Sequence, residues 1–121
     1  MGNGPPEQPL DPIAVRAAEQ HMPTPRNERR MKQLLDALCD ATRLKIVRAL
    51  SDTTLAAGDL AHVIKRSRSA TSQHLKVLRD AGAVVARRQG NVVRYTLSTD
   101  VSGDIIEDAA KAFDKLQRTD A

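Results

Sequence analysis

The segment from Ser67 to Gly82 carries the start and stop signals of a single helix. Serine is a favoured N-cap residue, and helices commonly end at a glycine in the left-handed conformation. Directly afterwards, the β-rich runs Val84–Arg88 and Val92–Leu97 are joined by Gln89-Gly90-Asn91, which is a hairpin signal. A helix that leads straight into a hairpin restricts the chain to a mainly α fold with one two-stranded β-hairpin.

Helical spacing of apolar residues predicts four more helices before this segment and one after the hairpin. Thr24 with Pro25 and, further on, Asp40 supply capping signals for the second and third helices. The expected order is α-α-α-α-α-β-β-α. Besides the helix after Ser67, the predicted helices are Ile13 to about Met22, one from Pro25 with apolar positions as far as Leu38, one after Asp40 containing Leu44 to Leu50, Ala57–Ile64, and Val101 to about Arg118.

Composition sets the expected domain organisation. Residues 1–12 contain four prolines and two glycines, so we expect a flexible leader there. Residues 13–118 are expected to form one domain, followed by a short tail at 119–121. The chain has 121 residues and two aromatic ones, Tyr95 and Phe113, so its modest core must be built from Leu, Ile, Val and Ala. Small domains of this kind often complete their core as dimers.

Positive charge is concentrated between Lys65 and Arg94. This window carries eight of the 19 lysines and arginines and one acid, Asp80, so it is +7 while the rest of the chain is about −3. Such asymmetry is typical of a protein that binds a polyanion, and the pI near 9.6 favours nucleic acid over a membrane surface. No apolar run approaches the roughly 18 residues of a spanning helix, and a single cysteine excludes an internal disulfide. We therefore expect a cytoplasmic protein with no membrane partner.

The predicted helix after Ser67 has two distinct faces. Helical spacing places Thr71, Leu75 and Leu78 on an inner face. The opposite face offers hydroxyls, an amide and a cation, which can meet base edges or phosphates, and the spacing places no carboxylate among them. The residues of that outer face are Ser69, Ser72, Gln73 and Lys76. The pattern favours a DNA-recognition helix, and the alternative is an ordinary solvated surface helix.

The predicted hairpin is strongly basic. Arg87, Arg88 and Arg94 crowd its stem and tip, and Gly90 permits a tight turn. A basic hairpin beside a recognition helix can reach the DNA backbone or a flanking minor groove. The alternative is a solvated hairpin whose cations protect its edges from aggregation.

Four segments in order resemble the ArsR-type (ArsR/SmtB) winged-helix repressors. They are Leu38-Cys-Asp-Ala-Thr-Arg-Leu-Lys-Ile-Val-Arg-Ala-Leu50, Gly58-Asp-Leu-Ala61, Ser69 to Gly82, and Arg87-Arg-Gln-Gly90 with Arg94-Tyr95. The resemblance implies a homodimeric winged helix-turn-helix protein that binds an inverted-repeat operator in double-stranded DNA, with its first and last helices at the dimer interface. It also implies DNA contacts, to the major groove from Arg68, Ser69, Thr71, Ser72 and Gln73, and through the wing from Arg87, Arg88 and Arg94.

The chain departs from this family where its members bind metals. Ala56 and Gly58 stand where arsenic-sensing members carry a Cys-x-Cys pair. On the last predicted helix, Asp104-Ile-Ile106 and Gln117-Arg-Thr-Asp120 lack both histidines of the zinc-sensing pattern. Two separated carboxylates alone make a poor transition-metal site. We therefore expect no metal and no other cofactor, although a histidine site around His21 at a dimer interface stays open.

Cys39 has two interpretations. It is a buried structural thiol between two apolar helices, or it senses redox changes or electrophiles, so a redox or small-molecule effector remains open. The chain contains no Ser-His-Asp arrangement, glycine-rich phosphate loop or paired carboxylates, so we do not expect an enzyme. The alternatives to a sequence-specific repressor are a winged-helix protein-interaction module and a non-specific architectural DNA binder.

Overall fold

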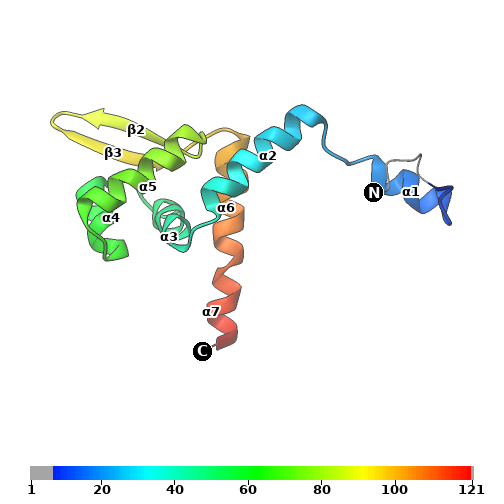
Figure 1. Ribbon diagram of the computed structural model, residues 1–121. Helices are drawn as coiled ribbons and strands as arrows, with labels where there is room; N and C mark the ends of the chain where they lie inside the picture. Colours follow the sequence, from blue (N-terminus) through cyan, green and yellow to red (C-terminus); the bar gives the residue numbers. More distant parts are fainter. Residues whose placement is uncertain (1–6, 121) are drawn as a thin grey trace. The chain divides into compact units, whose positions relative to one another are not determined.

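The computed structural model describes residues 7–120 and divides the chain into two units, before and after the boundary between Arg30 and Met31 (Figure 1). Each unit is described by itself. The elements in order are α1 (Pro12–Glu19), α2 (Pro25–Leu38), α3 (Ala41–Leu50), β1 (Leu55–Ala56), α4 (Ala57–Ile64), α5 (Arg68–Asp80), β2 (Val84–Gln89), β3 (Val92–Leu97), α6 (Val101–Ala112) and α7 (Asp114–Asp120).

The first unit contains α1 and the start of α2. The side chain of Asp11 caps α1 by accepting a hydrogen bond of 3.0 Å from the backbone N–H of Ala14. Thr24 caps α2 in the same way, as its sequence predicted, with Asn27 as the donor at 3.3 Å. Because Asp11 is the cap residue of α1, this helix begins at Pro12, one residue earlier than expected. Residues 1–6, half of the predicted leader, lie outside the described residues.

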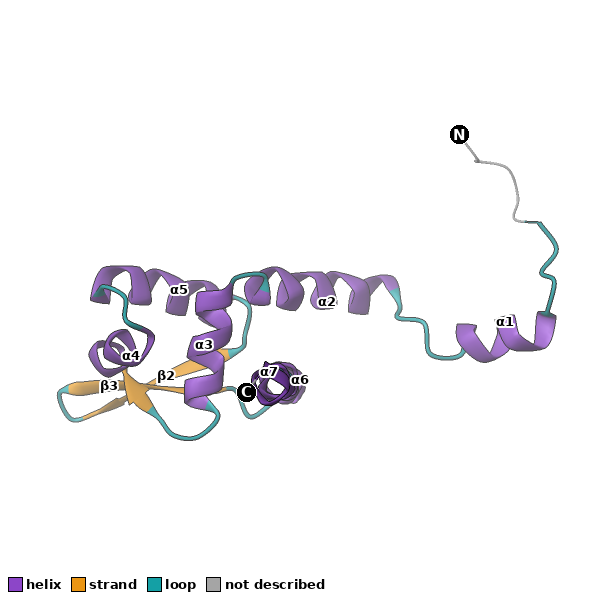
Figure 2. Ribbon diagram, turned by 90° about the horizontal axis from the view of Figure 1, so that it is seen from below, coloured by secondary structure: helices purple, strands orange, loops and turns teal. Residues whose placement is uncertain are grey.

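The second unit has an aliphatic core, as the composition predicted. Ile46 and Val47 of α3, Leu60 of α4, and Leu75 and Leu78 of α5 are completely or almost completely buried. Leu34 and Ala37 of α2, Val84 and Leu97 of the hairpin, and Ile106 of α6 close this core. One hydrophobic cluster thus joins the helix-turn-helix pair α4–α5 to the hairpin, which lies beside both helices in Figures 1 and 2.

Local signals fix the ends of the helix-turn-helix pair. Ser67 caps α5 by accepting a hydrogen bond of 3.0 Å from Ala70, and Gly82 takes the left-handed conformation after it with φ 78°. Both predictions are confirmed. Between the helices, Lys65 is also left-handed, with φ 57°, and the N–H of Arg66 reaches back to the carbonyl oxygen of Ala61 at 3.1 Å. This bond ends α4 and turns the chain into α5.

Two parts of the structure differ from the sequence prediction. Strand β1 was not predicted, and it pairs with β3 to give a three-stranded antiparallel sheet in the order β1-β3-β2. The single C-terminal helix predicted as far as Arg118 is divided at Phe113, where the N–H of Phe113 bonds to the carbonyl three residues back, and α7 continues to Asp120. Helices α6 and α7 still follow one common axis, as Figures 1 and 2 show.

Candidate nucleic-acid interface

Helix α5 presents the polar face that the sequence predicted. The side chains of Arg68, Ser69, Ser72, Gln73 and Lys76 are all exposed. On the opposite side of the helix, Leu75 and Leu78 are buried in the core. The core therefore holds α5 with its hydroxyl, amide and cationic groups directed to solvent, where they are accessible to a large ligand.

Thr71 corrects one expectation that came from the family resemblance. It is completely buried, and its hydroxyl donates a hydrogen bond of 2.8 Å to the carbonyl oxygen of Ser67. A side chain so placed has no route to a base edge. The helical spacing had placed Thr71 on the inner face, and that placement is confirmed.

The exposed face of α5 ends in the carboxylate of Asp80. The sequence pattern had predicted no carboxylate on this face. Asp80 pairs with Lys76 at 2.9 Å, one helical turn away. Both side chains are about two-thirds exposed or more, and exposed pairs contribute only about 0.2–1 kcal/mol. A phosphate can therefore replace Asp80 as the partner of Lys76 at little cost.

The strand register divides the three wing arginines between two faces of the sheet. Arg87 lies directly opposite Arg94, so these two cations share one face, whereas Arg88 lies opposite Val93 on the other face. Like charges directly opposite each other destabilise a hairpin. The residues from Val84 to Leu97 include no acid that could compensate them. A bound polyanion would relieve this repulsion.

Arg43 forms a junction that the sequence did not reveal. From α3 its guanidinium donates hydrogen bonds to the carbonyl oxygens of Asp36 and Ala37 at the end of α2, and its Nη1 lies 3.4 Å from Nδ1 of His74 on α5. The backbone N–H of Arg43 also bonds to the Asp40 carboxylate at 3.0 Å, which lowers the pKa of that group. Arg43 thus connects three helices next to the exposed face of α5.

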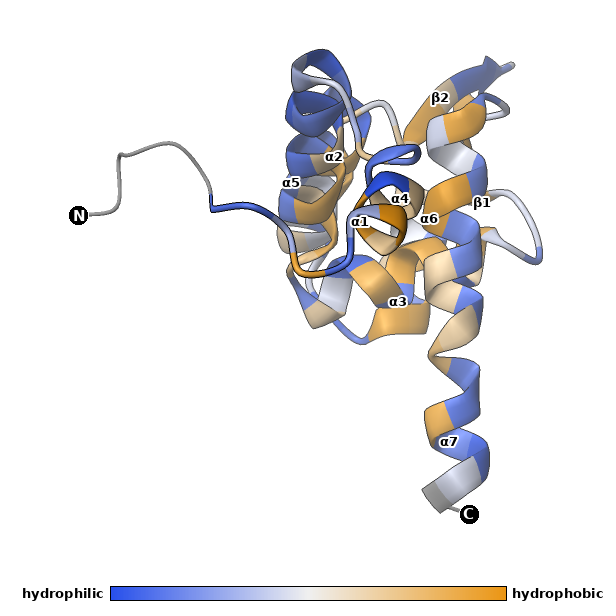
Figure 3. Cartoon of the chain, turned by 90° about the vertical axis from the view of Figure 1, so that its right-hand side faces the viewer, coloured by the Kyte–Doolittle hydropathy of each residue, from blue (hydrophilic) through white to orange (hydrophobic). Residues whose placement is uncertain are grey.

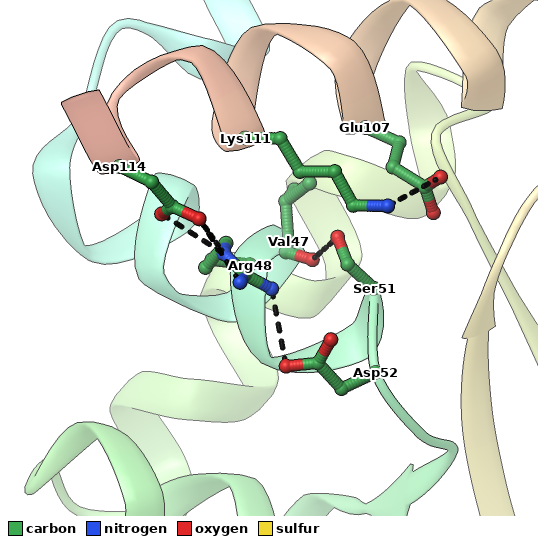
Figure 4. Close-up of polar contacts among 7 residues, drawn as sticks. All are labelled: Val47, Arg48, Ser51, Asp52, Glu107, Lys111 and Asp114. Atoms are coloured by element: carbon green, nitrogen blue, oxygen red, sulfur yellow. Dashed lines mark hydrogen bonds and ion pairs between the residues drawn. The ribbon is translucent and has the colours of Figure 1, made fainter.

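Arg48, at the other end of α3, connects this helix to α7 (Figure 4). Its Nε lies 3.0 and 3.1 Å from the two carboxylate oxygens of Asp114, and its Nη1 lies 3.1 Å from Asp52. The hydrogen bonds from Arg48 lower the pKa of Asp114, and those to Asp114 and Asp52 raise the pKa of Arg48. Asp114 follows Arg48 by 66 residues, so no local sequence signal could have identified the pair.

Several large apolar side chains of the second unit remain exposed. Apolar residues recur along α6 and α7, whose ribbon in Figure 3 alternates between orange and blue segments. Several of them are exposed. The exposed fraction is 72% for Val101, 51% for Ile105, 52% for Phe113 and 59% for Leu116. Met31 and Leu35 of α2 are exposed as well. Such side chains on one pair of helices are typical of a surface that another chain covers.

Three further expectations from the sequence concern Cys39, metal ligands and membrane-spanning helices. Cys39 is exposed, so its interpretation as a buried thiol is wrong. Among the described residues, no group of three or more His, Cys, Asp and Glu side chains could hold a metal ion. No helix formed by these residues is long and apolar enough to span a bilayer.

Comparison with known proteins relates this geometry to a family. Residues 40–85 match the model for bacterial regulatory proteins of the arsR family. The transcriptional activator HlyU of Vibrio cholerae is 39% identical over 74 residues, which cover 61% of this chain and 68% of HlyU. A transcriptional repressor SmtB homolog of Synechocystis is 32% identical over 115 residues, covering 94% of this chain and 85% of the relative. A solved structure of HlyU from Vibrio cholerae superimposes with a TM-score of 0.68 at 34% identity and covers 74% of this chain and 98% of HlyU.

Proposed function

Since this chain belongs to the ArsR family of bacterial regulatory proteins, we propose that it is a homodimeric transcriptional repressor that binds an inverted-repeat operator. Relatives in this family include both activators and repressors, and the shared function is that of a DNA-binding transcription regulator. Repression is favoured because the SmtB homolog, a repressor, aligns with 94% of this chain, whereas the activator HlyU aligns with 61%. Bacterial DNA lies in the cytoplasm, so a cytoplasmic location is part of the proposal.

The observation that carries the proposal is the exposed polar face of α5 over a buried apolar one. In a helix-turn-helix protein the second helix enters the major groove and reads base edges with its exposed side chains. Ser69, Ser72 and Gln73 are suited to base edges, and Arg68 and Lys76 to phosphates. The wing arginines would contact the flanking backbone, with Arg87 and Arg94 on one face of the hairpin and Arg88 on the other.

A dimer is proposed because two copies of α5 are needed to read an inverted repeat. The exposed apolar residues of α6 and α7, with Met31 and Leu35 of α2, offer a surface that a second copy can cover. Two recognition helices related by a two-fold axis would then enter major grooves about 34 Å apart, one helical turn of DNA. Binding across a promoter would exclude polymerase.

Three variants of the full chain test this assignment in a mobility-shift titration at two salt concentrations. Gln73→Ala should relax the base preference at one position of each half-site. Arg88→Ala should weaken binding to all sequences and reduce the salt slope by about one. Thr71→Val should leave base preference unchanged, because Thr71 is buried. Lys115→Ala, which removes one charge from α7, is the control for Arg88→Ala.

The outcomes separate the repressor from its alternatives. Strong, salt-sensitive and sequence-selective binding that responds to Gln73→Ala supports the proposal. Salt-sensitive binding with no preference over competitor DNA would identify an architectural binder. Weak binding that ignores salt and sequence would identify a protein-interaction module. If Arg88→Ala and Lys115→Ala behave alike, the wing does not contact DNA.

A further inference from the structure

A cavity of about 730 Å³, widely open to solvent, is lined by residues of α3, α4 and α7 in the second unit. This volume falls within the range of about 300–1,000 Å³ that small-molecule sites occupy. Its walls combine an apolar and a charged part. The residues that matter for its chemistry are Lys45 and Arg48 of α3, Val63 and Ile64 of α4, and Asp114 and Arg118 of α7.

The apolar part of the cavity comes from α4. Ile64 is almost fully buried at 5% exposure, whereas Val63 next to it is 53% exposed. An exposed valine beside a buried isoleucine provides hydrocarbon surface that a ligand can cover without any rearrangement of the core. A ligand of this cavity therefore needs an apolar body.

The charged part of the cavity has an excess of positive charge. Arg48 forms ion pairs with both carboxylates of the lining, Asp114 and Asp52. Its single positive charge neutralises one of their two negative charges. Lys45 and Arg118 form no ion pair with any side chain in the described part of the chain. The charge of Arg118 acts on Asp114 without forming an ion pair with it. Because the lining holds three cations, Lys45, Arg48 and Arg118, and two carboxylates, its excess positive charge favours an anion as the ligand's head group.

We propose that this cavity is the effector site of the regulator and that its ligand is a small organic anion with an apolar body, of the class of aromatic or medium-chain monocarboxylates. The hydrocarbon part would cover Val63. The carboxylate would bind Lys45 and Arg118 and compete with Asp114 for Arg48. This inference rests on the proposed function, because an effector has meaning only for a protein that binds an operator.

Competition at Arg48 would act on the proposed dimer surface. Asp114 begins α7, and the exposed Phe113 and Leu116 lie immediately beside it in the chain. A ligand that replaces Asp114 on Arg48 would favour a conformation in which α7 is no longer held to α3. A ligand shifts such an equilibrium only by its difference in affinity for the two conformations. The two affinities would differ because the ligand binds Arg48 fully only in the conformation in which Asp114 has left it. The change of conformation would also change the distance between the two copies of α5.

The test uses the full chain with benzoate and octanoate as probes and the neutral benzamide and octanamide as matched controls. Binding is followed by NMR chemical-shift changes at Val63 and Ile64 and by calorimetry, at probe concentrations up to about 10 mM, because millimolar dissociation constants are expected for unoptimised probes. Operator affinity is measured in parallel. We expect at least one carboxylate to bind at this cavity and to weaken operator binding by about tenfold, and the amides to do neither.

A double variant, Lys45→Gln with Arg118→Gln, should lose the response to the carboxylates while binding the operator normally in their absence. Lys115→Gln on the same helix, outside the cavity lining, should keep the response. If neither carboxylate shifts the Val63 and Ile64 resonances, or if the double variant responds like the wild type, the site is wrong. If the probes bind but operator affinity is unchanged, the effector role is wrong. Failure to bind any operator without probe would instead refute the proposed function, and the NMR result would still decide whether the cavity binds the anion.

Discussion

Gly103 is the position at which we expect a single added methyl group to cost most. It lies in the first turn of α6, where its N–H donates a 3.1 Å hydrogen bond to the carboxylate of Asp100. A Cβ atom at Gly103 would lie 1.8 Å from the carbonyl oxygen of Ser98 and 2.6 Å from its carbonyl carbon. Both atoms belong to the backbone at the end of the sheet, so no side chain can rotate away. The start of α6 would have to move by more than about 1 Å in a close-packed region.

The expected magnitude of Gly103→Ala follows from two opposing terms. Alanine in a helix is favoured over glycine by about 1 kcal/mol, whereas overpacking a rigid site costs typically about 1–3 kcal/mol, and this contact belongs at the upper end. We expect a net loss of about 2 kcal/mol in the free energy of unfolding. In a domain of this size that lowers Tm by roughly 6–12 °C.

Gly58→Ala is the matched control, and thermal unfolding followed by circular dichroism is the assay. Gly58 is also helical, in α4, but a Cβ atom there would meet no atom within 4 Å. Gly58→Ala should therefore raise Tm by a few degrees, since only the helix-propensity gain of up to about 1 kcal/mol remains. Opposite signs for the two substitutions are the expected result. Equal shifts, or a Gly103→Ala protein as stable as the wild type, would refute the close approach of α6 to Ser98.

Two further predictions concern Lys65 and Asp114. Lys65→Gly should stabilise the chain by about 1 kcal/mol in chemical denaturation, because glycine adopts the left-handed conformation of this turn without strain, and loss of operator affinity in the same variant would indicate a phosphate contact. The lowered pKa of Asp114 means that its pair with Arg48 contributes stability above about pH 4, which is lost as pH falls further through the folded-state value. Asp114→Asn should therefore flatten the acid-unfolding curve below about pH 4 without abolishing it, since the pKa of Asp40 is lowered too. Parallel curves for the variant and wild type would contradict this linkage.

Features that depend on neighbouring residues were predictable from the sequence. The caps Asp40 and Ser67 and the left-handed Gly82 occur where they were expected, because each signal and its hydrogen-bond partner lie within a few residues. The inner face of α5 was predictable for the same reason. Thr71 shows the value of that local rule, because the helical spacing placed it correctly where the family resemblance did not.

Features that depend on distant or very short segments were not predictable. Strand β1 has two residues, too few to show an alternating pattern, and it exists because β3 offers a free edge at Arg94 and Tyr95. The exposure of Cys39 could not be inferred from the two apolar helices that it joins, because the direction of one side chain at a helix junction depends on tertiary packing. The Arg43–His74 and Arg48–Asp114 contacts join residues that are 31 and 66 positions apart.

These two arginine contacts give α3 a central place in the unit. At its first turn, Arg43 holds the end of α2 and contacts His74 on α5, and near its last turn Arg48 holds α7. The buried face of α3, formed by Ile46, Val47 and Leu50, fixes the helix in the core between them. A ten-residue helix in a close-packed core moves as one body, over a length of about 15 Å. If the Arg48–Asp114 contact breaks, a movement of α3 can therefore displace α5 through the Arg43–His74 contact. This requires no deformation of the hairpin or of α4.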